Sequence, residues 1–471
     1  MQTADYDLVV IGSGPGGYTG AIRAAQLGMR VACVEKQAKL GGTCLLVGCI
    51  PSKTLLEATE KFVLSRDHYG RMGIRCENVA IDLPVLMARK DKVVDTLSSG
   101  ITGLFKKNKV DKLIGMAEFL SANQLKITGV DGEKTITARK ILIATGSVPI
   151  ELPHIKFNAQ NVISSDQAIA LQKVPEHMTV IGAGAIGLEL SSVWQRLGTK
   201  VTVLEMMPGV LPGVDDEMRR LMERTLRDQG LEFYFNVQAT GVKTENGKLQ
   251  IGFVSKAPEA KSEETFLSTD IVLVAVGRRA YTEGLRANEI GVNTDNRGRI
   301  LVNHAWETSA PNVFAIGDVI SGPMLAHKAE EEAIAAVELM AGKAGHVNYD
   351  TIPSVVYTAP EFAWVGKTEE QLKETGIKYK TGKFRFTANA RALSMDEAQG
   401  MVKILAEAAS DRVLGVHIIG PQASSLISEA VIAMELGASS EDIARTCHAH
   451  PSLPEAIREA ALGVEGRTIN S

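Results

Sequence analysis

The residues best suited to chemistry in this chain are two cysteines, Cys44 and Cys49. They lie in the stretch Gly-Gly-Thr-Cys-Leu-Leu-Val-Gly-Cys-Ile-Pro-Ser-Lys over positions 41–53. The Pro-Ser-Lys-Thr sequence after Cys49 indicates a helix that begins near Cys49, with proline in its first turn. A thiol at a helix N-terminus and near a lysine has a lowered pKa and is reactive. The pattern therefore favours a disulfide that opens and closes.

Two other interpretations of this pair compete with a redox disulfide. Metal binding would need two further ligands, and the sequence has no second Cys pair or Cys/His cluster at zinc-like spacing. Buried, inert thiols are the other alternative, and Cys33 in the apolar run 31–34 fits that description. The helix start beside Lys53 argues against inertness at Cys49.

Thiol–disulfide exchange moves protons, so a base has to lie beside the thiols. His450 and Glu455, near the C-terminal end, are the candidates. Glu455 has a second interpretation, because Ser452-x-x-Glu455 forms a capping box for the last helix, with Pro454 in its first turn. The two interpretations are compatible.

A glycine-rich strand–turn–helix unit precedes the thiols and occurs a second time. In each copy a following strand ends at an acid, Glu35 or Glu205, at the same spacing from the first glycine. The first glycine permits a tight turn, the second lets the backbone approach a pyrophosphate, and the third lets the helix pack on the strand. The helix N-terminus attracts phosphates, and the acid accepts bonds from ribose hydroxyls. The glycines are Gly12, Gly14 and Gly17 in the first copy and Gly182, Gly184 and Gly187 in the second.

The second acid also selects between nucleotides. Glu205 is followed by Met206 and Met207 rather than by arginine, which favours the free 2′-hydroxyl of NAD over the 2′-phosphate of NADP. We interpret Arg219 and Arg220, further along, as solvated helix charges.

Three apolar runs that end at a glycine, 141–146, 271–277 and 313–317, read as buried strands of parallel sheets. They indicate that the second unit is inserted into the first domain. After about residue 350, strands at 402–404 and 414–420 precede helices at 424–437 and 454–462, which is an α+β pattern. We expect an α/β fold of two Rossmann-like domains, at 1–149 with 278–350 and at 150–277, and an α+β domain at 351–471.

Composition excludes several classes of function. The chain has 471 residues and a net charge of −4, so no basic field points to nucleic acid. No run approaches the roughly 18 apolar residues of a membrane span, and no signal peptide is visible. Five cysteines, an odd number, argue against a structural disulfide framework. We expect a cytoplasmic protein, although a processed organelle protein would have the same appearance.

These motifs resemble those of the flavin-dependent disulfide oxidoreductases, class I of the pyridine nucleotide-disulfide oxidoreductases, and most closely the dihydrolipoamide dehydrogenases. The resemblance covers essentially the whole chain. It rests on the 41–53 motif after the first glycine loop, and it extends to Ala-Thr-Gly-Ser at 144–147, Ala-Ile-Gly-Asp at 315–318, Met-Leu-Ala-His-Lys at 324–328 and His-Ala-His-Pro at 448–451.

The resemblance implies FAD in the first domain, NAD in the second and dimerisation through the third. Glu35 would bind the FAD ribose, Lys53 would lie near the reactive edge of the flavin, and Asp318 would hold the ribityl–pyrophosphate region. Glu189 would lie near Lys53 and the nicotinamide, and Ala117 and Ala326 would offer backbone groups. The implied cofactor-binding positions are Gly12, Gly14, Gly17, Glu35, Lys36, Gly42, Thr43, Lys53, Ala117, Thr145, Gly146, Asp318, Ala326, Gly182, Gly184, Gly187, Glu189, Glu205, Ala239 and Gly277.

The resemblance also implies a homodimer in which His450 is the base and Glu455 orients it, both acting on the partner subunit's thiols. Cys44 would exchange with substrate and Cys49 would face the flavin. The predicted activity is oxidation of dihydrolipoyl groups with reduction of NAD. The expected partners are the lipoyl domains of 2-oxo acid dehydrogenase acyltransferase cores or the glycine cleavage lipoyl carrier.

Three other functions are alternatives to this prediction. A glutathione-type reductase would need NADP and arginines after the second glycine loop. A mercuric reductase would need a C-terminal cysteine pair, whereas this sequence ends Gly-Arg-Thr-Ile-Asn-Ser. A non-catalytic dinucleotide-binding redox sensor would keep the fold and could lose the reacting residues, all of which are present here.

Three positions depart from the implied pattern. Leu46 replaces the usual Asn between the thiols, Pro454 replaces the usual Ser or Thr before the glutamate, and Ala117 stands where Gly is common. None of these is a reacting group, so we expect them to affect rate and redox potential more than activity itself.

Overall fold

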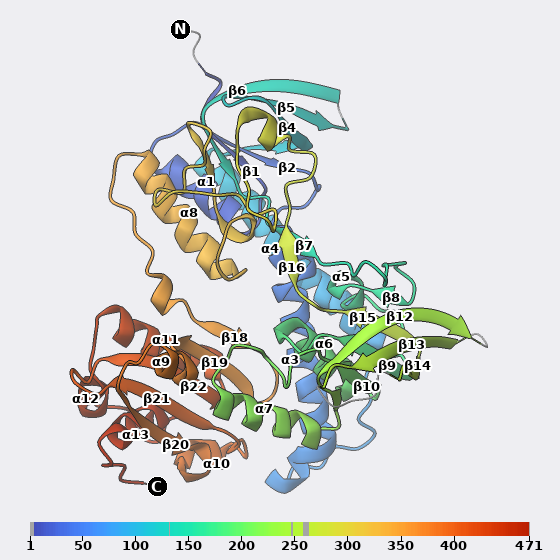
Figure 1. Ribbon diagram of the computed structural model, residues 1–471, viewed down its shortest axis with the longest axis vertical. Coiled ribbons are helices and arrows are strands. Elements are labelled where there is room, and N and C mark those ends of the chain that lie inside the picture. The colour runs from blue at the N-terminus through green and yellow to red at the C-terminus, as the bar shows by residue number, and fades with distance from the viewer. Residues whose placement is uncertain (1–3, 131, 246–247, 258–262, 471) are drawn as a thin grey trace.

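The computed structural model describes residues 4–130, 132–245, 248–257 and 263–470. Its elements form three lobes, each built on one main sheet (Figure 1). A pair of short strands carries the chain between the first and second lobes, and residues 341–353 lead from the first lobe to the third.

The first lobe holds a seven-stranded sheet. Its strands are β1 (Tyr6–Ile11), β2 (Val31–Glu35), β3 (Asp111–Ile114), β4 (Met116–Ser121), β5 (Gln124–Gly129), β6 (Gly132–Ile143) and β17 (Val313–Ala315). The order is β3-β2-β1-β6-β5-β4, with β17 also paired to β6. The β1, β2, β3 and β17 pairings are parallel, whereas β4, β5 and the start of β6 form an antiparallel meander. The apolar run of β1 is buried on both faces, as helix-covered parallel strands require.

Two helices from distant parts of the sequence pack together against this sheet, α1 (Pro15–Gln26) and α8 (Ala326–Met340). Gly16 of α1 allows this, because a Cβ at that position would lie 2.9 Å from the carbonyl oxygen of Ala329 in α8. The chain therefore returns to the first lobe after the second lobe is complete, as the sequence indicates.

The second lobe repeats the parallel arrangement in a five-stranded sheet of order β11-β10-β9-β15-β8. Its strands are β8 (Val162–Ile163), β9 (His177–Ile181), β10 (Lys200–Leu204), β11 (Glu232–Tyr234) and β15 (Ile271–Val274). An antiparallel sheet beside it contains β12 (Val237–Glu245), β13 (Lys248–Ser255) and β14 (Thr265–Thr269). The helices of this lobe are α5 (Ser165–Ala168), α6 (Ala185–Arg196) and α7 (Asp216–Asp228).

The connection between the first two lobes is a two-stranded sheet of β7 (Ser147–Pro149) and β16 (Arg278–Ala280). One strand leaves the first lobe and the other returns to it. Three further helices follow β2: α2 (Gly42–Val47), α3 (Cys49–Val63) and α4 (Leu83–Asn108). α3 packs on α6 of the second lobe, so the cysteine segment touches both glycine-loop units.

The third lobe is an antiparallel sheet of order β18-β19-β22-β21-β20 with helices around it. Its strands are β18 (Ser354–Val356), β19 (Glu361–Gly366), β20 (Tyr379–Arg385), β21 (Met401–Glu407) and β22 (Val413–Gly420). Its helices are α9 (Glu369–Glu374), α10 (Ala390–Ser394), α11 (Ala423–Glu435), α12 (Ser440–Arg445) and α13 (Glu455–Val464). The predicted α/β fold with a C-terminal α+β part is confirmed.

Short helical turns complete the chain: η1 (Leu64–His68), η2 (Tyr69–Met72), η3 (Ala287–Ile290), η4 (Gly317–Val319), η5 (Tyr349–Thr351) and η6 (Phe386–Ala388). None of the helices in the described ranges combines the length and the apolar sequence required to cross a membrane.

Candidate functional site

A cavity of about 1020 Å³ runs from the first glycine loop, past the cysteines, to the second glycine loop. Most of the residues singled out from the sequence line it. They are Gly12, Gly14, Gly17, Glu35, Lys36, Gly42, Thr43, Cys44, Cys49, Lys53, Ala117, Thr145, Gly146, Asp318, Ala326, Gly182, Gly184, Glu189, Glu205, Ala239 and Gly277. Three singled-out residues, Gly187, His450 and Glu455, are absent from its lining.

The first glycine loop joins β1 to α1 and is closed by Glu35. Gly12 has a φ of +100°, and a Cβ there would lie 2.4 Å from the carbonyl oxygen of Ala144. One Glu35 oxygen accepts the backbone N–H of Ser13 at 2.9 Å and its hydroxyl at 2.7 Å, and the other accepts the N–H of Gln37 at 3.0 Å. The acid therefore braces the loop and still faces the cavity.

The second glycine loop, between β9 and α6, has the same backbone geometry. Gly182 has a φ of +105°, and a Cβ there would lie 2.5 Å from the carbonyl oxygen of Ala275. Glu205 accepts the N–H of Ala183 at 2.7 Å and that of Met207 at 2.8 Å. Gly187 serves packing, because a Cβ there would lie 2.1 Å from the carbonyl oxygen of Gly182.

The cysteine segment covers the first loop. Gly42, at the start of α2, has a φ of +58°, and a Cβ there would lie 2.6 Å from the Cα of Gly14. The N–H of Gly41 donates to the carbonyl oxygen of Ser13 at 3.1 Å and lies 3.2 Å from its hydroxyl. This contact places Thr43 and Cys44 directly over the glycine loop.

The two thiols meet where α2 ends and α3 begins. Cys49 is the first residue of α3, as predicted, and the Cys44 thiol donates a hydrogen bond to it. That bond, together with the charge of Lys53, outweighs desolvation and lowers the pKa of Cys49 to about 7. The same bond and burial raise the pKa of Cys44. The pair is thus unequal, with Cys49 the thiolate and Cys44 the proton donor.

Lys53 lies one helical turn after Cys49 on α3, so both side chains share a face. Burial would lower the pKa of Lys53, but the carboxylate of Glu189 outweighs it and holds the pKa above its usual value. Nζ of Lys53 lies 2.7 Å from Oε2 of Glu189, and the other Glu189 oxygen accepts the N–H of Tyr357 at 2.9 Å. The contact joins residues of all three lobes.

The turns after β6 and β17 meet on the first-lobe side of the cavity. The Ser147 hydroxyl donates to Asp318 at 2.6 Å, and Nε of Arg278 donates to that hydroxyl at 2.8 Å. Behind the Asp318 turn, a fully buried Lys328–Glu332 ion pair at 3.0 Å stabilises the backbone, and Glu332 accepts the Gly317 N–H at 2.8 Å. Asp318 is therefore held on a rigid turn.

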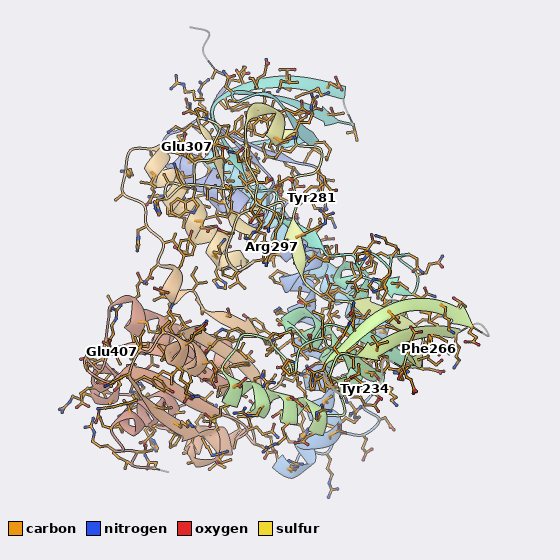
Figure 2. All side chains as sticks on the ribbon, in the orientation of Figure 1. Tyr234, Phe266, Tyr281, Arg297, Glu307 and Glu407 are labelled. Carbon is orange, nitrogen blue, oxygen red and sulfur yellow. The ribbon has the colours of Figure 1, made fainter. Side chains whose placement is uncertain are left out.

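Sequence reasoning missed several residues that line the cavity. Arg278 also donates to the carbonyl oxygen of Ser147 at 2.7 Å and lies 3.5 Å from the Thr43 hydroxyl. Its position directly after the Gly277 turn could have identified it. Tyr281, labelled in Figure 2, follows β16, and its ring centroid lies 3.8 Å from Nζ of Lys36. No local pattern pairs residues so far apart in sequence.

His450 and Glu455 lie together on the third lobe, away from this chain's own cavity. Nδ1 of His450 lies 2.9 Å from Oε1 of Glu455, and the His450 side chain is 72% exposed. Burial would raise the pKa of Glu455, but His450 and the Ser452 N–H, which donates at 2.8 Å, hold the pKa below its usual value. Glu455 thus fixes Nδ1 and leaves Nε2 facing outward.

Two interpretations from the sequence need correction here. The capping box is only half formed: α13 begins at Glu455, and the buried Ser452 hydroxyl has no hydrogen-bond partner among the residues that the structure describes. Pro454 occupies the N-cap position, so the hydroxyl does not reach the helix start. Arg219 is not a solvated charge, because its side chain is only 16% exposed and lies against Gly209, whereas that of Arg220 is 63% exposed.

Cys33 and Leu46 belong to the core of the first lobe. Cys33 is completely buried, and burial raises the pKa of its thiol, which makes it inert. Leu46 is partly buried and packs against the apolar cluster under the first loop. The apolar side chain between the two cysteines therefore contributes packing.

Family models match two consecutive parts of the chain. Residues 6–333 match the model described as pyridine nucleotide-disulphide oxidoreductase, and residues 352–461 match the dimerisation domain of the same family. The chain belongs to the pyridine nucleotide-disulphide oxidoreductase family. It is therefore an oxidoreductase, and the family's cofactors are FAD and NAD, as predicted from the sequence. The dimerisation domain supports the predicted homodimer.

Relatives and solved structures agree with this membership over nearly the full length. Mitochondrial dihydrolipoyl dehydrogenase of Pisum sativum is 50% identical over 98% of this chain and 92% of its own length. Leghemoglobin reductase of Vigna unguiculata is 50% identical over 97% of this chain and 87% of its own length. The crystal structure of LpdA from Mycobacterium tuberculosis aligns with a TM-score of 0.88 at 26% identity, covering 96% of this chain and 98% of that one.

Proposed function

We propose that this chain is a dihydrolipoyl dehydrogenase, which oxidises a protein-bound dihydrolipoyl group and reduces NAD. The observation that carries the proposal is the unequal thiol pair on the wall of a cavity joining two glycine loops. A dithiol in that place can accept two electrons from one side and pass them on through the cavity. The identity of about 50% to dihydrolipoyl dehydrogenases from plants and animals supports this substrate.

The residues at both loops fit dinucleotides. Gly14 and Gly184 are the N-caps of α1 and α6, and neither helix start receives a side-chain hydrogen bond in the described structure. Their N–H groups suit a pyrophosphate. We assign FAD to the first loop with Glu35, Asp318 and the residues around them, and NAD to the second loop with Glu205. Bound FAD supplies a two-electron carrier between the dithiol and NAD.

The thiol chemistry follows from the unequal pair. With Cys44 and Cys49 joined as a disulfide, a substrate thiolate attacks the sulfur of Cys44, and Cys49 leaves as a thiolate that Lys53 stabilises. The second substrate thiol, deprotonated by His450 of the partner subunit, then attacks the mixed disulfide. Cys44 is released, and the lipoyl ring closes as a disulfide. Two electrons now reside on the cysteine pair.

We assign the base to the other subunit, and the position of His450 outside the lining of its own chain's cavity supports this assignment. Glu455 accepts the Nδ1 proton and orients the ring, so Nε2 is free to take the substrate proton. We further propose the division into domains at 1–149 with 278–350, at 150–277 and at 351–471, and a cytoplasmic location. Lipoyl domains of 2-oxo acid dehydrogenase cores, or the glycine cleavage carrier, would deliver the substrate.

The test is turnover of purified holoenzyme with dihydrolipoamide and NAD, compared with glutathione disulfide and NADPH. We expect NADH formation with the first pair and no NADPH oxidation with the second. Double-reciprocal lines should be parallel, because the two substrates need not meet. Anaerobic dihydrolipoamide should produce a long-wavelength thiolate–flavin absorbance, which Cys49→Ser should abolish. Survival of that band in Cys49→Ser would contradict the mechanism. A preference for glutathione disulfide would contradict the proposed substrate.

A further inference from the structure

A buried ion cluster joins the third lobe to the second glycine-loop unit. Nζ of Lys403, on β21, lies 3.0 and 2.8 Å from the two carboxylate oxygens of Asp215. It also lies 2.6 Å from Oε2 of Glu369 and 3.1 Å from Oε2 of Glu217. The side chains of Lys403 and Asp215 are both fully buried. Buried charges are tolerated only when they are paired this closely, so Lys403 ties Asp215 firmly to the sheet.

The outer side of the cluster is solvated. Lys383 pairs with Glu217 at 2.8 Å and Lys373 pairs with Glu369 at 3.0 Å, with side chains 43% and 61% exposed. These two lysines offset the extra carboxylates. His417 stands opposite Lys403 in the β21–β22 register, and burial lowers its pKa to about 4, so its ring is neutral. Lys403 is therefore the cation at the centre of the cluster.

Asp215 links Lys403 to the start of a helix. It is the N-cap of α7, where Oδ1 accepts the N–H of Glu217 at 3.1 Å and that of Met218 at 3.3 Å. Its Oδ2 lies 3.4 Å from the N–H of Glu369, the first residue of α9. One carboxylate thus joins helices from two lobes, and Lys403 holds it in place.

The segment before Asp215 forms part of the wall of the second nucleotide site. Residues 206–214 connect Glu205 to Asp215, and Met206 and Pro212 line the cavity. The N–H of Leu211 donates to the carbonyl oxygen of Ala183 in the glycine loop at 2.9 Å. This segment is fixed at one end by Glu205 and at the other by Asp215.

We propose that Lys403 is a positioning residue for the adenosine ribose of the pyridine nucleotide. It acts through Asp215 on the 206–214 segment, and through that segment on the carboxylate of Glu205. The inference rests on the assignment of NAD to the second loop. Without Lys403, the carboxylates of Asp215, Glu217 and Glu369 repel one another and the start of α7 shifts. Ordering the 206–214 segment then becomes part of the cost of binding.

The test is Lys403→Met in the purified holoenzyme dimer, read by calorimetric titration with ADP-ribose, which carries the adenosine ribose but does not react. We expect the Kd to rise roughly tenfold, because the segment must then be ordered on binding. Anaerobic reduction by dihydrolipoamide without NAD should stay within about twofold of the wild type, since Cys44 and Cys49 are untouched. Lys403→Arg keeps the charge and should recover part of the affinity.

Lys383→Met is the matched control, because it removes an exposed lysine from the same cluster and should leave ADP-ribose affinity unchanged. If Lys403→Met does not form a dimer, the same titration is made with Asp215→Asn, which should also weaken ADP-ribose binding. Asparagine keeps the helix cap and removes the charge that Lys403 holds. Wild-type affinity in a dimeric Lys403→Met or in Asp215→Asn would overturn the proposal. The two proposals can fail separately. If the wild-type enzyme does not oxidise dihydrolipoamide but Lys403→Met still weakens ADP-ribose binding, only the proposed function is refuted.

Discussion

The two glycine-loop units share one backbone design and differ in what covers them. In both, the first glycine has a φ near +100°, its N–H donates at 2.8 Å to the strand carrying the acid, and the acid braces the loop. Over the first loop lies the cysteine segment, with Gly42 against Gly14. A Cβ at Gly14 would lie 4.0 Å from the Cα of Gly42, whereas a Cβ at Gly184 would meet no atom of the described residues within 4 Å.

This difference matches two kinds of ligand. A resident cofactor gains from a covered site because its escape is slowed, whereas a nucleotide that enters and leaves at each turnover needs an open one. The cover over the first loop also carries the redox thiols, so enclosure of the cofactor and placement of Cys44 come from the same six-residue helix, α2. On the second loop the 206–214 segment makes the corresponding contact, from the N–H of Leu211 to the carbonyl oxygen of Ala183, but it carries no cysteine and is held through Asp215 and Lys403.

Gly42→Ala should have the largest effect on the difference between the two glycine loops. The substitution places a Cβ 2.6 Å from the Gly14 backbone and strains a residue whose φ is +58°. We expect loss of FAD, and with it a loss of activity greater than about a hundredfold, since the cover can no longer close. Flavin absorbance of the purified protein measures this. Gly184→Ala is the control and should retain FAD; full flavin content in Gly42→Ala would contradict the cover.

Glu205→Gln tests how the second glycine loop selects between NAD and NADP. Removing the charge should cut the preference for NAD over NADP by roughly tenfold, because the 2′-phosphate is no longer repelled. The ratio of kcat/KM for the two nucleotides measures the change. Flavin content should stay normal, and a ratio equal to that of the wild type would show that Glu205 does not face the ribose.

The thiol pair on the cover should show a pH dependence set by its surroundings. The pKa of Cys49 is lowered to about 7 by the Cys44 hydrogen bond and by Lys53, so the thiolate persists above pH 7 and is lost as pH falls through that value. Alkylation of reduced enzyme by iodoacetamide should follow this midpoint. In Lys53→Met the midpoint should rise by roughly one pH unit.

Lys36→Met is the matched control, because Lys36 contacts the Tyr281 ring and not the thiols. It should leave the pH midpoint of alkylation unchanged. An identical midpoint in Lys53→Met and the wild type would mean that the charge of Lys53 does not reach Cys49.

The smallest effect is expected from Ser13→Ala, which makes the first loop resemble the second, where Ala183 stands. The change removes the hydroxyl bond to Glu35 and should cost about 1 kcal/mol of stability. Thermal unfolding of the holoenzyme measures the loss. The reciprocal Ala183→Ser should give no matching gain, and a neutral Ser13→Ala would show that the hydroxyl is not used.

Local sequence determined much of this molecule. Glycines that need positive φ, the apolar strands around them, and the helix beginning at Cys49 are short-range features, and each was predictable from a few neighbouring residues. The fold class and the two dinucleotide units followed from them, whereas much of the cavity lining followed from the resemblance of the motifs to a known family. The capping box failed because α13 begins at Glu455, two residues after the start that a Ser452 cap requires, so the Ser452 hydroxyl does not reach the helix.

Only the tertiary structure decided which distant groups meet. Lys53 pairs with Glu189 across 136 positions, Arg278 approaches Thr43 across 235, and Lys403 holds Asp215 across 188. No periodicity encodes such contacts, because they depend on how the lobes pack rather than on the conformation of any one segment. By itself the sequence specified two similar nucleotide loops and a reactive thiol pair. The tertiary structure placed the cysteine segment against the first loop and the 206–214 segment, held by Lys403 of the third lobe, against the second, and thereby made the two loops different.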